Sequence, residues 1–142
     1  MSSDFVLDCS VTMTWFFAHE ATQATDAIQS RLAGEATAFV PLHWRLEVGN
    51  TLLGAERKTA KSQSETEHFL GLLSALSIET DGQTDTRALS NILSLARQHK
   101  LTSYDAAYLD LALSRGIPLA TLDKELRAAS KKLGVALLPE VL

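Results

Sequence analysis

Four acidic residues occupy positions in this sequence where an unpaired carboxylate is costly to bury. Asp8 ends the apolar run DFVLD, and Asp123 directly follows the apolar run IPLATL. Glu47 and Asp105 lie near the start of two helical patterns, within LEVGN and SYDAAYL. Three or four carboxylates gathered in one place need a positive counter-charge to stay ionised.

Oxygen ligands without a histidine or cysteine partner suit hard cations, chiefly Mg²⁺ or Mn²⁺. The histidines share no metal-ligand spacing; they are His19, His43, His68 and His99. Ions of this kind bind phosphate oxygens and activate water as a nucleophile. The acids therefore indicate phosphoryl-transfer chemistry with Mg²⁺, or alternatively Mn²⁺, as the cofactor.

The elements that must position these acids follow from the apolar pattern. Short apolar runs predict strands at residues 4–8, 37–41, 76–80, 117–122 and 135–138. Apolar residues at helical spacing predict helices at residues 11–34 with a break near 18–20, and at 44–58, 63–76, 89–96, 104–116 and 124–132. Strands that alternate with helices imply a three-layer α/β/α fold around a mostly parallel sheet.

In such a sheet, ligands bind outside the carboxyl ends of the strands. Asp8 and Asp123 follow two of the predicted strands, and Glu47 begins the helix after another. These three acids belong on one edge of the sheet by topology alone. The position of Asp105 is less constrained, because its helix leads into a strand and does not follow one.

Four motifs in order carry a resemblance to a known family: VLDCSVTMTWFFAHE, VPLHWRLEVGN, HKLTSYDAAYLDLA and LATLDKEL. Together they resemble the PIN domain, in the subgroup of VapC-type ribonuclease toxins, and they span nearly the whole chain. The resemblance implies one PIN domain over residues 1–142. It assigns the catalytic and metal-binding acids as Asp8, Glu47, Asp105 and Asp123, and so implies that Asp105 does reach the site.

The family also implies the reaction and the partners. We expect the protein to cleave RNA endonucleolytically with a water activated by Mg²⁺ or Mn²⁺. We also expect it to form a homodimer and to be neutralised by a cognate VapB-type antitoxin. The products would carry 5′ phosphate and 3′ hydroxyl ends. Cys9, where small residues such as alanine are common in the family, is expected to be a packed side chain and not a nucleophile.

Polar neighbours of the acids are candidates for an outer shell of hydrogen bonds, namely Ser10, Asn50, Thr102 and Thr121. Each acid also has a simpler reading. Asp8 and Asp123 can cap the helices that follow them, Asp105 can favour the positive end of its own helix, and Glu47 can be a solvated helix residue. Asp110 is five residues after Asp105, about 140° around the helix, and is predicted to point away. The remaining aspartates read as surface or turn acids: Asp4, Asp26, Asp81 and Asp85.

Composition limits the alternatives. The chain has 142 residues, a net charge of −4 and one cysteine, Cys9. One domain of this size buries a single core, and the absence of disulfides, of an apparent signal peptide and of a membrane-length apolar run predicts a cytoplasmic protein. The negative charge argues against a passive nucleic-acid-binding module. Basic residues near 124–132 are candidates for contacts with the RNA backbone.

Two other functions are weighed against the nuclease. An aspartyl-phosphate protein of the phosphatase or receiver type also has an acid after its first strand, but the phosphatase pattern Asp-x-Asp is replaced here by Asp8-Cys9-Ser10. A non-catalytic PIN-like interaction domain would not need all four acids. Finally, an apolar excess predicts a partner-binding surface formed by Trp15, Phe16, Phe17, Ile28 and Leu32.

Overall fold

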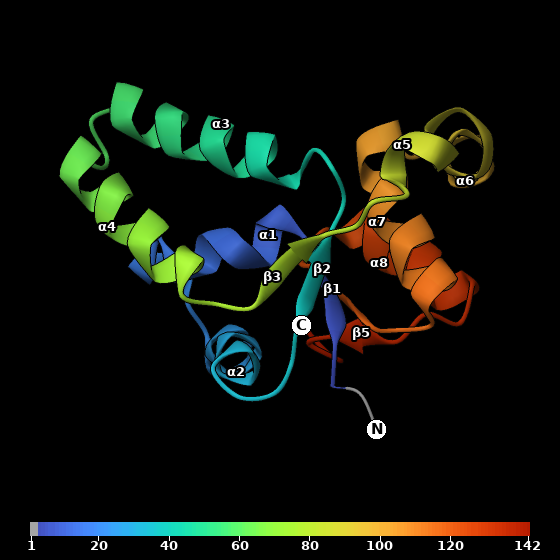
Figure 1. Cartoon of the computed structure of the whole chain (residues 1–142), viewed down its shortest axis with the longest axis horizontal. Helices are drawn as coiled ribbons and strands as arrows, with labels where there is room; N and C mark the ends of the chain where they lie inside the picture. Colours follow the sequence, from blue (N-terminus) through green and yellow to red (C-terminus); the bar gives the residue numbers. More distant parts are fainter. Residues whose placement is uncertain (1–2) are drawn as a thin grey trace.

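A single parallel sheet of five short strands forms the centre of the computed structural model, which describes residues 3–142 (Figure 1). The strands are β1 (Phe5–Leu7), β2 (Ala38–Val40), β3 (Ile78–Thr80), β4 (Leu119–Ala120) and β5 (Leu137–Leu138). Their order across the sheet is β3-β2-β1-β4-β5, and every neighbouring pair is parallel. Each strand falls inside a predicted apolar run, so the predicted α/β fold is confirmed.

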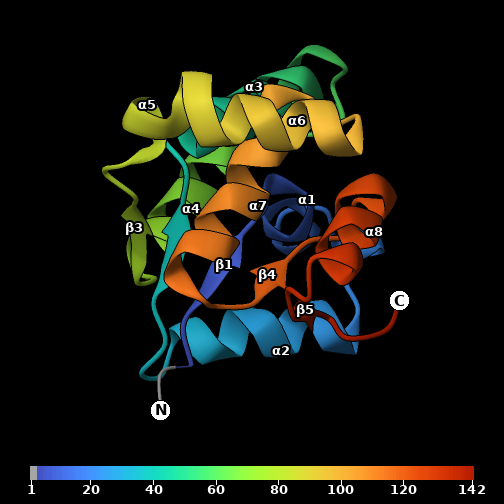
Figure 2. The same cartoon turned by 90° about the vertical axis from the view of Figure 1, so that its right-hand side faces the viewer.

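Helices cover both faces of the sheet. They are α1 (Cys9–Thr12), α2 (Gln23–Leu32), α3 (Trp44–Arg57), α4 (Gln63–Ser74), α5 (Thr84–Arg87), α6 (Leu93–His99), α7 (Ser103–Arg115) and α8 (Lys124–Lys132). Short 3-10 segments η1 (Met13–Trp15) and η2 (Ala18–Glu20) break the first helical region where predicted, and a π-helical segment η3 (Ala88–Ile92) joins α5 to α6. Figures 1 and 2 show α1–α4 on one side of the sheet and α5–α8 on the other.

Local sequence fixes where the helices begin and end. Reciprocal hydrogen bonds between side chains and backbone form capping boxes at the start of α2, from Thr22 and Thr25, and of α4, from Ser62 and Glu65. Helix α7 ends at Gly116, whose φ of 65° is a left-handed conformation that glycine adopts without strain. The connection from α7 to β4 is therefore short, and α7 runs back across the sheet.

The core lies on both faces of the sheet, and α7 contributes the longest run of buried residues. Strands β1 and β4 are fully buried, as expected for parallel strands covered on both faces. Residues 106–112 of α7 are all buried, and Tyr108 is the largest of the fully buried side chains. Because α7 packs against β1 and β4 and ends where β4 begins, its first turn lies at the carboxyl edge of the sheet.

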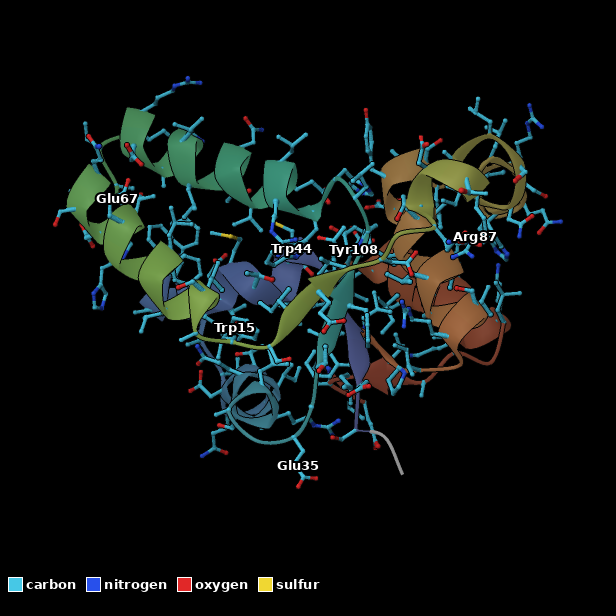
Figure 3. All side chains as sticks on the ribbon, viewed as in Figure 1. Trp15, Glu35, Trp44, Glu67, Arg87 and Tyr108 are labelled. Atoms are coloured by element: carbon cyan, nitrogen blue, oxygen red, sulfur yellow. The ribbon has the colours of Figure 1, made fainter. Side chains whose placement is uncertain are left out.

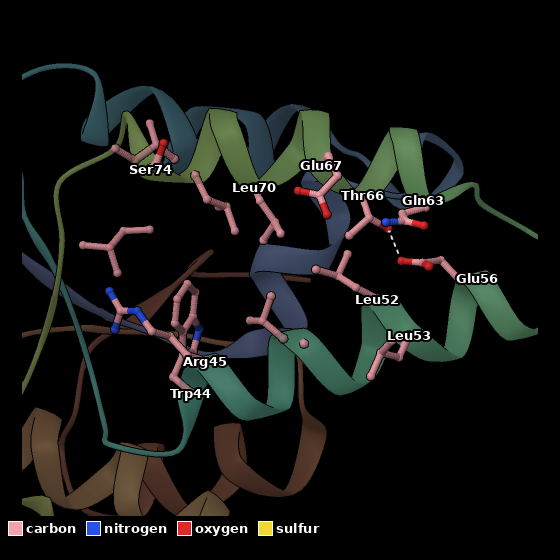
Figure 4. A pocket seen from close by; sticks show the side chains of 15 residues that line it. Trp44, Arg45, Leu52, Leu53, Glu56, Gln63, Thr66, Glu67, Leu70 and Ser74 are labelled. Atoms are coloured by element: carbon pink, nitrogen blue, oxygen red, sulfur yellow. Dashed lines mark hydrogen bonds between the residues drawn. The ribbon is translucent and has the colours of Figure 1, made fainter.

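Helices α3 and α4 extend from the body of the protein as a hairpin, shown on the left in Figure 1. A cleft of about 650 Å³ separates them, with apolar side chains such as Leu52 and Leu70 pointing into it (Figure 4). Near the tip of the hairpin, the Thr66 hydroxyl donates a 2.8 Å hydrogen bond to the Glu56 carboxylate. The two helices therefore form the walls of an open apolar groove, which we call the α3–α4 groove.

The partner-binding surface predicted at residues 15–32 is wrong. Phe16 is buried against Phe69 of α4, with 5.0 Å between ring centroids, and Ile28 and Leu32 are buried too. Trp15 is half-buried and donates its indole N–H to the backbone oxygen of Thr25 at 2.9 Å. Helix α4 and the core cover these groups. The large exposed leucines lie elsewhere, and many are on α3, α4 or the loop before α3: Leu42, Leu46, Leu53, Leu70 and Leu72.

Asp81 was predicted to be a surface or turn acid. Its carboxylate does accept the Gln83 N–H of the following turn at 3.0 Å, but it is not at the surface. Asp81 directly follows β3 and is buried, with its carboxylate 2.9 Å from the Arg115 guanidinium and 3.8 Å from that of Arg87. These ion pairs join the end of β3 to α5 and α7. Over residues 3–142, the helices are all too short or too polar to cross a lipid bilayer.

Candidate active site

Asp8 lies at the carboxyl end of β1 and is only 6% exposed. Its side chain makes no capping hydrogen bond to α1. Instead, one carboxylate oxygen, Oδ2, accepts hydrogen bonds of 2.7 Å from both the Ser10 and the Thr121 hydroxyls. Burial raises the pKa of Asp8, the hydrogen bonds from Thr121 and Ser10 oppose that rise, and the charges of Glu47 and Asp123 add to it. The capping explanation for Asp8 therefore does not hold.

The same two hydroxyls connect Asp8 to Asp123. The Thr121 hydroxyl accepts the Asp123 backbone N–H at 3.1 Å, and the Ser10 hydroxyl accepts the Leu122 N–H at 2.9 Å. One oxygen of Asp123 caps α8 by accepting the Leu126 N–H at 2.8 Å. The capping role foreseen for Asp123 is thus real, and it holds this carboxylate in a fixed orientation beside Asp8.

Glu47 faces the site from the first turn of α3, where two side chains hold it. The buried Tyr108 hydroxyl donates a hydrogen bond to Oε1 of Glu47, and His43 Nε2 lies 3.4 Å from the same oxygen. Burial raises the pKa of Tyr108, and the charge of Asp8 and the hydrogen bond to Glu47 raise it further. Tyr108 therefore remains a neutral donor to Glu47. Figure 3 shows Tyr108 close to the strands, near Trp44 of α3.

Asp105 lies near enough to the other three acids for their charges to raise its pKa. It lies in the first turn of α7, where its backbone N–H is capped by the Thr102 hydroxyl at 3.1 Å. Burial raises the pKa of Asp105 to about 6, with further increases from the negative charges of Asp123, Asp8, Glu47 and Glu125. The helix start that topology left unconstrained thus lies at the site. We call Asp8, Glu47, Asp105 and Asp123 the acidic cluster.

The cluster carries negative charge that the protein does not balance. Within residues 3–142, its carboxylates form no ion pair with lysine or arginine, and His43 lies 3.4 Å from Glu47. Over the same residues, no three His, Cys, Asp or Glu side chains converge closely enough to hold one ion as they stand. Mg²⁺ commonly takes one or two carboxylates and keeps several waters. The acidic cluster offers only oxygen ligands, and no lysine or arginine among the described residues is paired to them, so its chemistry fits such an ion.

Residues 5–132 match the PIN domain. The chain belongs to the PIN-domain family. A comparison with curated proteins finds no match for this PIN domain.

Solved structures share the fold of this PIN domain. The crystal structure of PAE2754 from Pyrobaculum aerophilum aligns with a TM-score of 0.68 and 23% identity, covering 98% of this chain and 93% of the other. VapBC2 from Rickettsia felis, bound to a DNA fragment from its promoter, aligns with a TM-score of 0.63 and 15% identity, covering 88% and 92%. A toxin–antitoxin complex from Klebsiella pneumoniae aligns with a TM-score of 0.57 and 18% identity, covering 84% and 86%.

The candidate outer-shell residues of this PIN domain divide into two groups. Ser10 and Thr121 contact Asp8 directly, as described above. Thr102 contacts only the backbone of Asp105 and acts as a helix cap. Asn50 is exposed one turn after Glu47, and its side chain makes no hydrogen bond within the part of the chain that the structure describes. Asn50 is therefore not part of the hydrogen-bond network around the acids.

Asp110 points away from the acidic cluster, as the helical rotation predicts. Its carboxylate lies 2.7 Å from Nε of Arg87, which also donates to the Ser114 hydroxyl at 3.0 Å. Arg87 is the last residue of α5, and its guanidinium also lies 3.8 Å from the carboxylate of Asp81 at the end of β3. Asp110 therefore serves to attach α5 to α7.

Three residues near the cluster were missed in the sequence. His43 lies four residues before Glu47, a spacing that places two side chains on one helical face. Tyr108 follows Asp105 by three residues, which places both side chains on one face of the helix. Glu125 adds charge to Asp105 from the first turn of α8. The sequence separation of these three residues from the acids could have identified them as neighbours of the site. It could not have identified the contact between Tyr108 and Glu47.

One of the basic residues near 124–132 is not available for a contact with RNA. Arg127 of α8 is buried, and its guanidinium donates to the backbone oxygens of Thr121, Pro139 and Glu140 at 2.8, 2.7 and 3.2 Å. A side chain with its donors occupied in this way is not available to a phosphate. Arg127 joins the C-terminal segment to the loop before Asp123.

The raised pKa of Asp105 predicts a characteristic pH dependence of stability. Because the folded protein holds the Asp105 proton more tightly than the unfolded chain does, this residue makes the metal-free protein less stable as pH rises from about 3.8 to about 6. We expect Asp105→Asn to remove that part of the dependence. Urea unfolding in EDTA at pH 4, 5, 6 and 7 measures it: the stability of Asp105→Asn relative to wild type should increase with pH. A constant difference would contradict the raised pKa.

Proposed function

We propose that this PIN domain is a VapC-type toxin, a divalent-metal-dependent endoribonuclease that acts on RNA in the cytoplasm. PIN domains as a class are nucleases. The observation that carries the proposal is the acidic cluster, with four carboxylates at the carboxyl edge of the sheet and no lysine or arginine paired to them within residues 3–142. The fold shared with toxins in toxin–antitoxin complexes supports the toxin assignment.

In this proposal Asp8, Glu47, Asp105 and Asp123 hold Mg²⁺, or Mn²⁺ in its place. A bound ion of this kind activates water and stabilises the charge on the leaving 3′ oxygen. The protein contributes pre-organisation: Ser10 and Thr121 fix Asp8, and Tyr108 fixes Glu47. Cys9 supplies no nucleophile, because burial raises the pKa of its thiol to about 12.

Removal of the metal tests the reaction directly. We expect the purified chain to cleave single-stranded RNA in Mg²⁺ or Mn²⁺ and to lose cleavage in EDTA, with recovery when the ion is restored. End-labelled RNA resolved on a sequencing gel, followed by ligation tests for 5′ phosphate and 3′ hydroxyl ends, measures it. Cleavage that persists in EDTA would contradict the metal-dependent mechanism. A phosphoryl group trapped on Asp8 would favour an aspartyl-phosphate enzyme instead.

We further propose that the α3–α4 groove receives an apolar helix of a VapB-type antitoxin. The groove is open, about 650 Å³ in volume, and lined by leucines from both helices (Figure 4). Two helices with an apolar space between them suit a third amphipathic helix. The structural relatives from Rickettsia felis and Klebsiella pneumoniae are toxin–antitoxin complexes, which supports this choice of partner.

Two matched leucines test the groove. Leu70 in the groove is 41% exposed, and Leu113 on α7, outside it, is 40% exposed. We expect Leu70→Glu to weaken binding of the co-expressed antitoxin by about thirty-fold, or roughly 2 kcal/mol, because a charge would enter an apolar contact. Leu113→Glu should have little effect. Titration calorimetry with the purified antitoxin measures both, and equal losses would place the antitoxin elsewhere.

We also propose that the protein forms a homodimer. Several large leucines remain exposed on the monomer, among them Leu42, Leu46 and Leu89, and exposed apolar groups commonly become buried on association. Light scattering at micromolar concentration tests this, with a dimer mass expected. A monomer mass would count against the dimer without affecting the nuclease.

A further inference from the structure

We propose that Tyr104 binds an unpaired nucleobase of the RNA by stacking, at the rim of the acidic cluster. This inference rests on the proposed ribonuclease function and adds a substrate-binding residue to it. The feature that prompts it is an exposed aromatic ring immediately before Asp105. Tyr104 is 63% exposed, whereas the residues of α7 from Ala106 to Ala112 are buried.

The Tyr104 ring is exposed but held in place. His43 lies edge-on to it with 5.3 Å between ring centroids, and His43 Nε2 is 3.1 Å from the Tyr104 backbone oxygen. The His43 ring in turn packs edge-on against Tyr108 at 5.4 Å, and Tyr108 is fully buried. A series of ring contacts thus connects the exposed tyrosine to the core. A ring that is already ordered loses little conformational entropy when a ligand stacks on it.

The position of the ring suits a nucleotide beside the reacting phosphate. Tyr104 directly precedes Asp105, whose pKa reflects the charges of the other three acids. His43, which contacts the Tyr104 ring, also lies 3.4 Å from the Glu47 carboxylate. Tyr104 is therefore adjacent to the acidic cluster through two different members of it. A base stacked on this ring would place its own sugar-phosphate near the carboxylates.

A stacking contact does not depend on the charge of the protein. The protein has a net charge of −4, and the four uncompensated acids repel a phosphate backbone when no metal is bound. Arg127, a basic residue near Asp123 in sequence, uses its donors inside the protein. Stacking of a base on an aromatic ring contributes about 1–3 kcal/mol and needs no positive charge. It requires an exposed base face, which single-stranded RNA offers and duplex RNA does not.

Binding measurements in a cleavage-deficient background test the proposal. In Asp8→Asn protein with Mg²⁺, we expect Tyr104→Leu to weaken binding of a fluorescent single-stranded RNA 12-mer by about 5- to 150-fold, the equivalent of 1–3 kcal/mol. Tyr104→Phe, which keeps the ring, should bind within about twofold of the parent. Duplex RNA of the same sequence should bind Tyr104→Leu and its parent equally. Fluorescence anisotropy measures all three.

The outcomes separate this inference from the proposed function. If wild-type protein cleaves RNA but Tyr104→Leu and Tyr104→Phe bind it equally well, the stacking role is wrong and the nuclease assignment stands. The stacking role is also wrong if the leucine weakens binding of duplex and single strand alike, or if it changes the oligomeric mass while the RNA affinity of the assembled protein is kept. If wild-type protein neither binds nor cleaves RNA, the proposed function itself fails.

Discussion

Substitution of Asp8 by asparagine is expected to lower RNA cleavage by about 10³-fold or more while the protein stays folded. A carboxylate that helps to hold the metal ion stabilises the transition state by several kcal/mol, and each 1.36 kcal/mol is a factor of ten in rate. Asparagine has nearly the same volume, and its oxygen can still accept the hydrogen bonds from Ser10 and Thr121. Single-turnover cleavage at saturating Mg²⁺ measures the loss.

Stability provides the control for this variant. Because burial raises the pKa of Asp8, the neutral amide removes an unfavourable buried charge at pH 7. We expect the metal-free Asp8→Asn protein to be at least as stable as wild type in urea, and to gain less stability from Mg²⁺. Undiminished cleavage by a variant preparation free of contaminating nuclease would remove Asp8 from the site. An unfolded variant would show that Asp8 supports the fold and would contradict the expected stability.

The second large effect is a contrast between two aspartates of one helix. Asp105→Asn should reduce cleavage by about 10²- to 10³-fold, since it removes charge from the acidic cluster. Asp110→Asn should keep cleavage within a few-fold of wild type, because Asp110 pairs with Arg87 at 2.7 Å on the other side of α7. The expected order is reversed for stability. Asp110→Asn should cost about 1–3 kcal/mol by weakening a buried charged hydrogen bond, and Asp105→Asn should cost nothing.

Cleavage rates and urea unfolding at pH 7 on the same two preparations measure the contrast. The design needs no separate control, since each variant is the control for the other. If both substitutions abolish cleavage in folded protein, then Asp110 contributes to the site and the side assigned to it on α7 is wrong. If neither does, Asp105 is not a functional member of the acidic cluster.

Much of the fold could be predicted because its signals are local. Each strand is a short apolar run, and each lies where its run predicts it, as with β1 in DFVLD and β4 in IPLATL. The direction of Asp110 also followed from 3.6 residues per turn of one helix. The topology of a parallel sheet then placed Asp8, Glu47 and Asp123 on one edge, because crossovers return every strand in the same direction.

The position of Asp105 needed the arrangement of a helix relative to a strand. Helix α7 ends at Gly116 just before β4, so it runs opposite to that strand and begins at the carboxyl edge, beside the other acids. The sequence shows the glycine that ends the helix, but it does not show how the helix packs against the strand. The apolar pattern around Phe16 was misread for a related reason: it indicates an apolar ring, but it does not show that Phe69 of α4 covers that ring.

The contacts that set the chemistry of the site belong to the tertiary structure alone. Thr121 bonds to Asp8 across 113 positions of sequence, and Tyr108 bonds to Glu47 across 61. The sequence by itself determined which residue types stand at the strand ends and which helical face each acid occupies, because backbone periodicity controls both. It did not determine which hydroxyl meets which carboxylate, how far burial raises the pKa of Asp105, or that α3 and α4 separate to leave a groove. Those features depend on the packing of elements that are distant in sequence, because the close packing of many side chains together determines each local geometry.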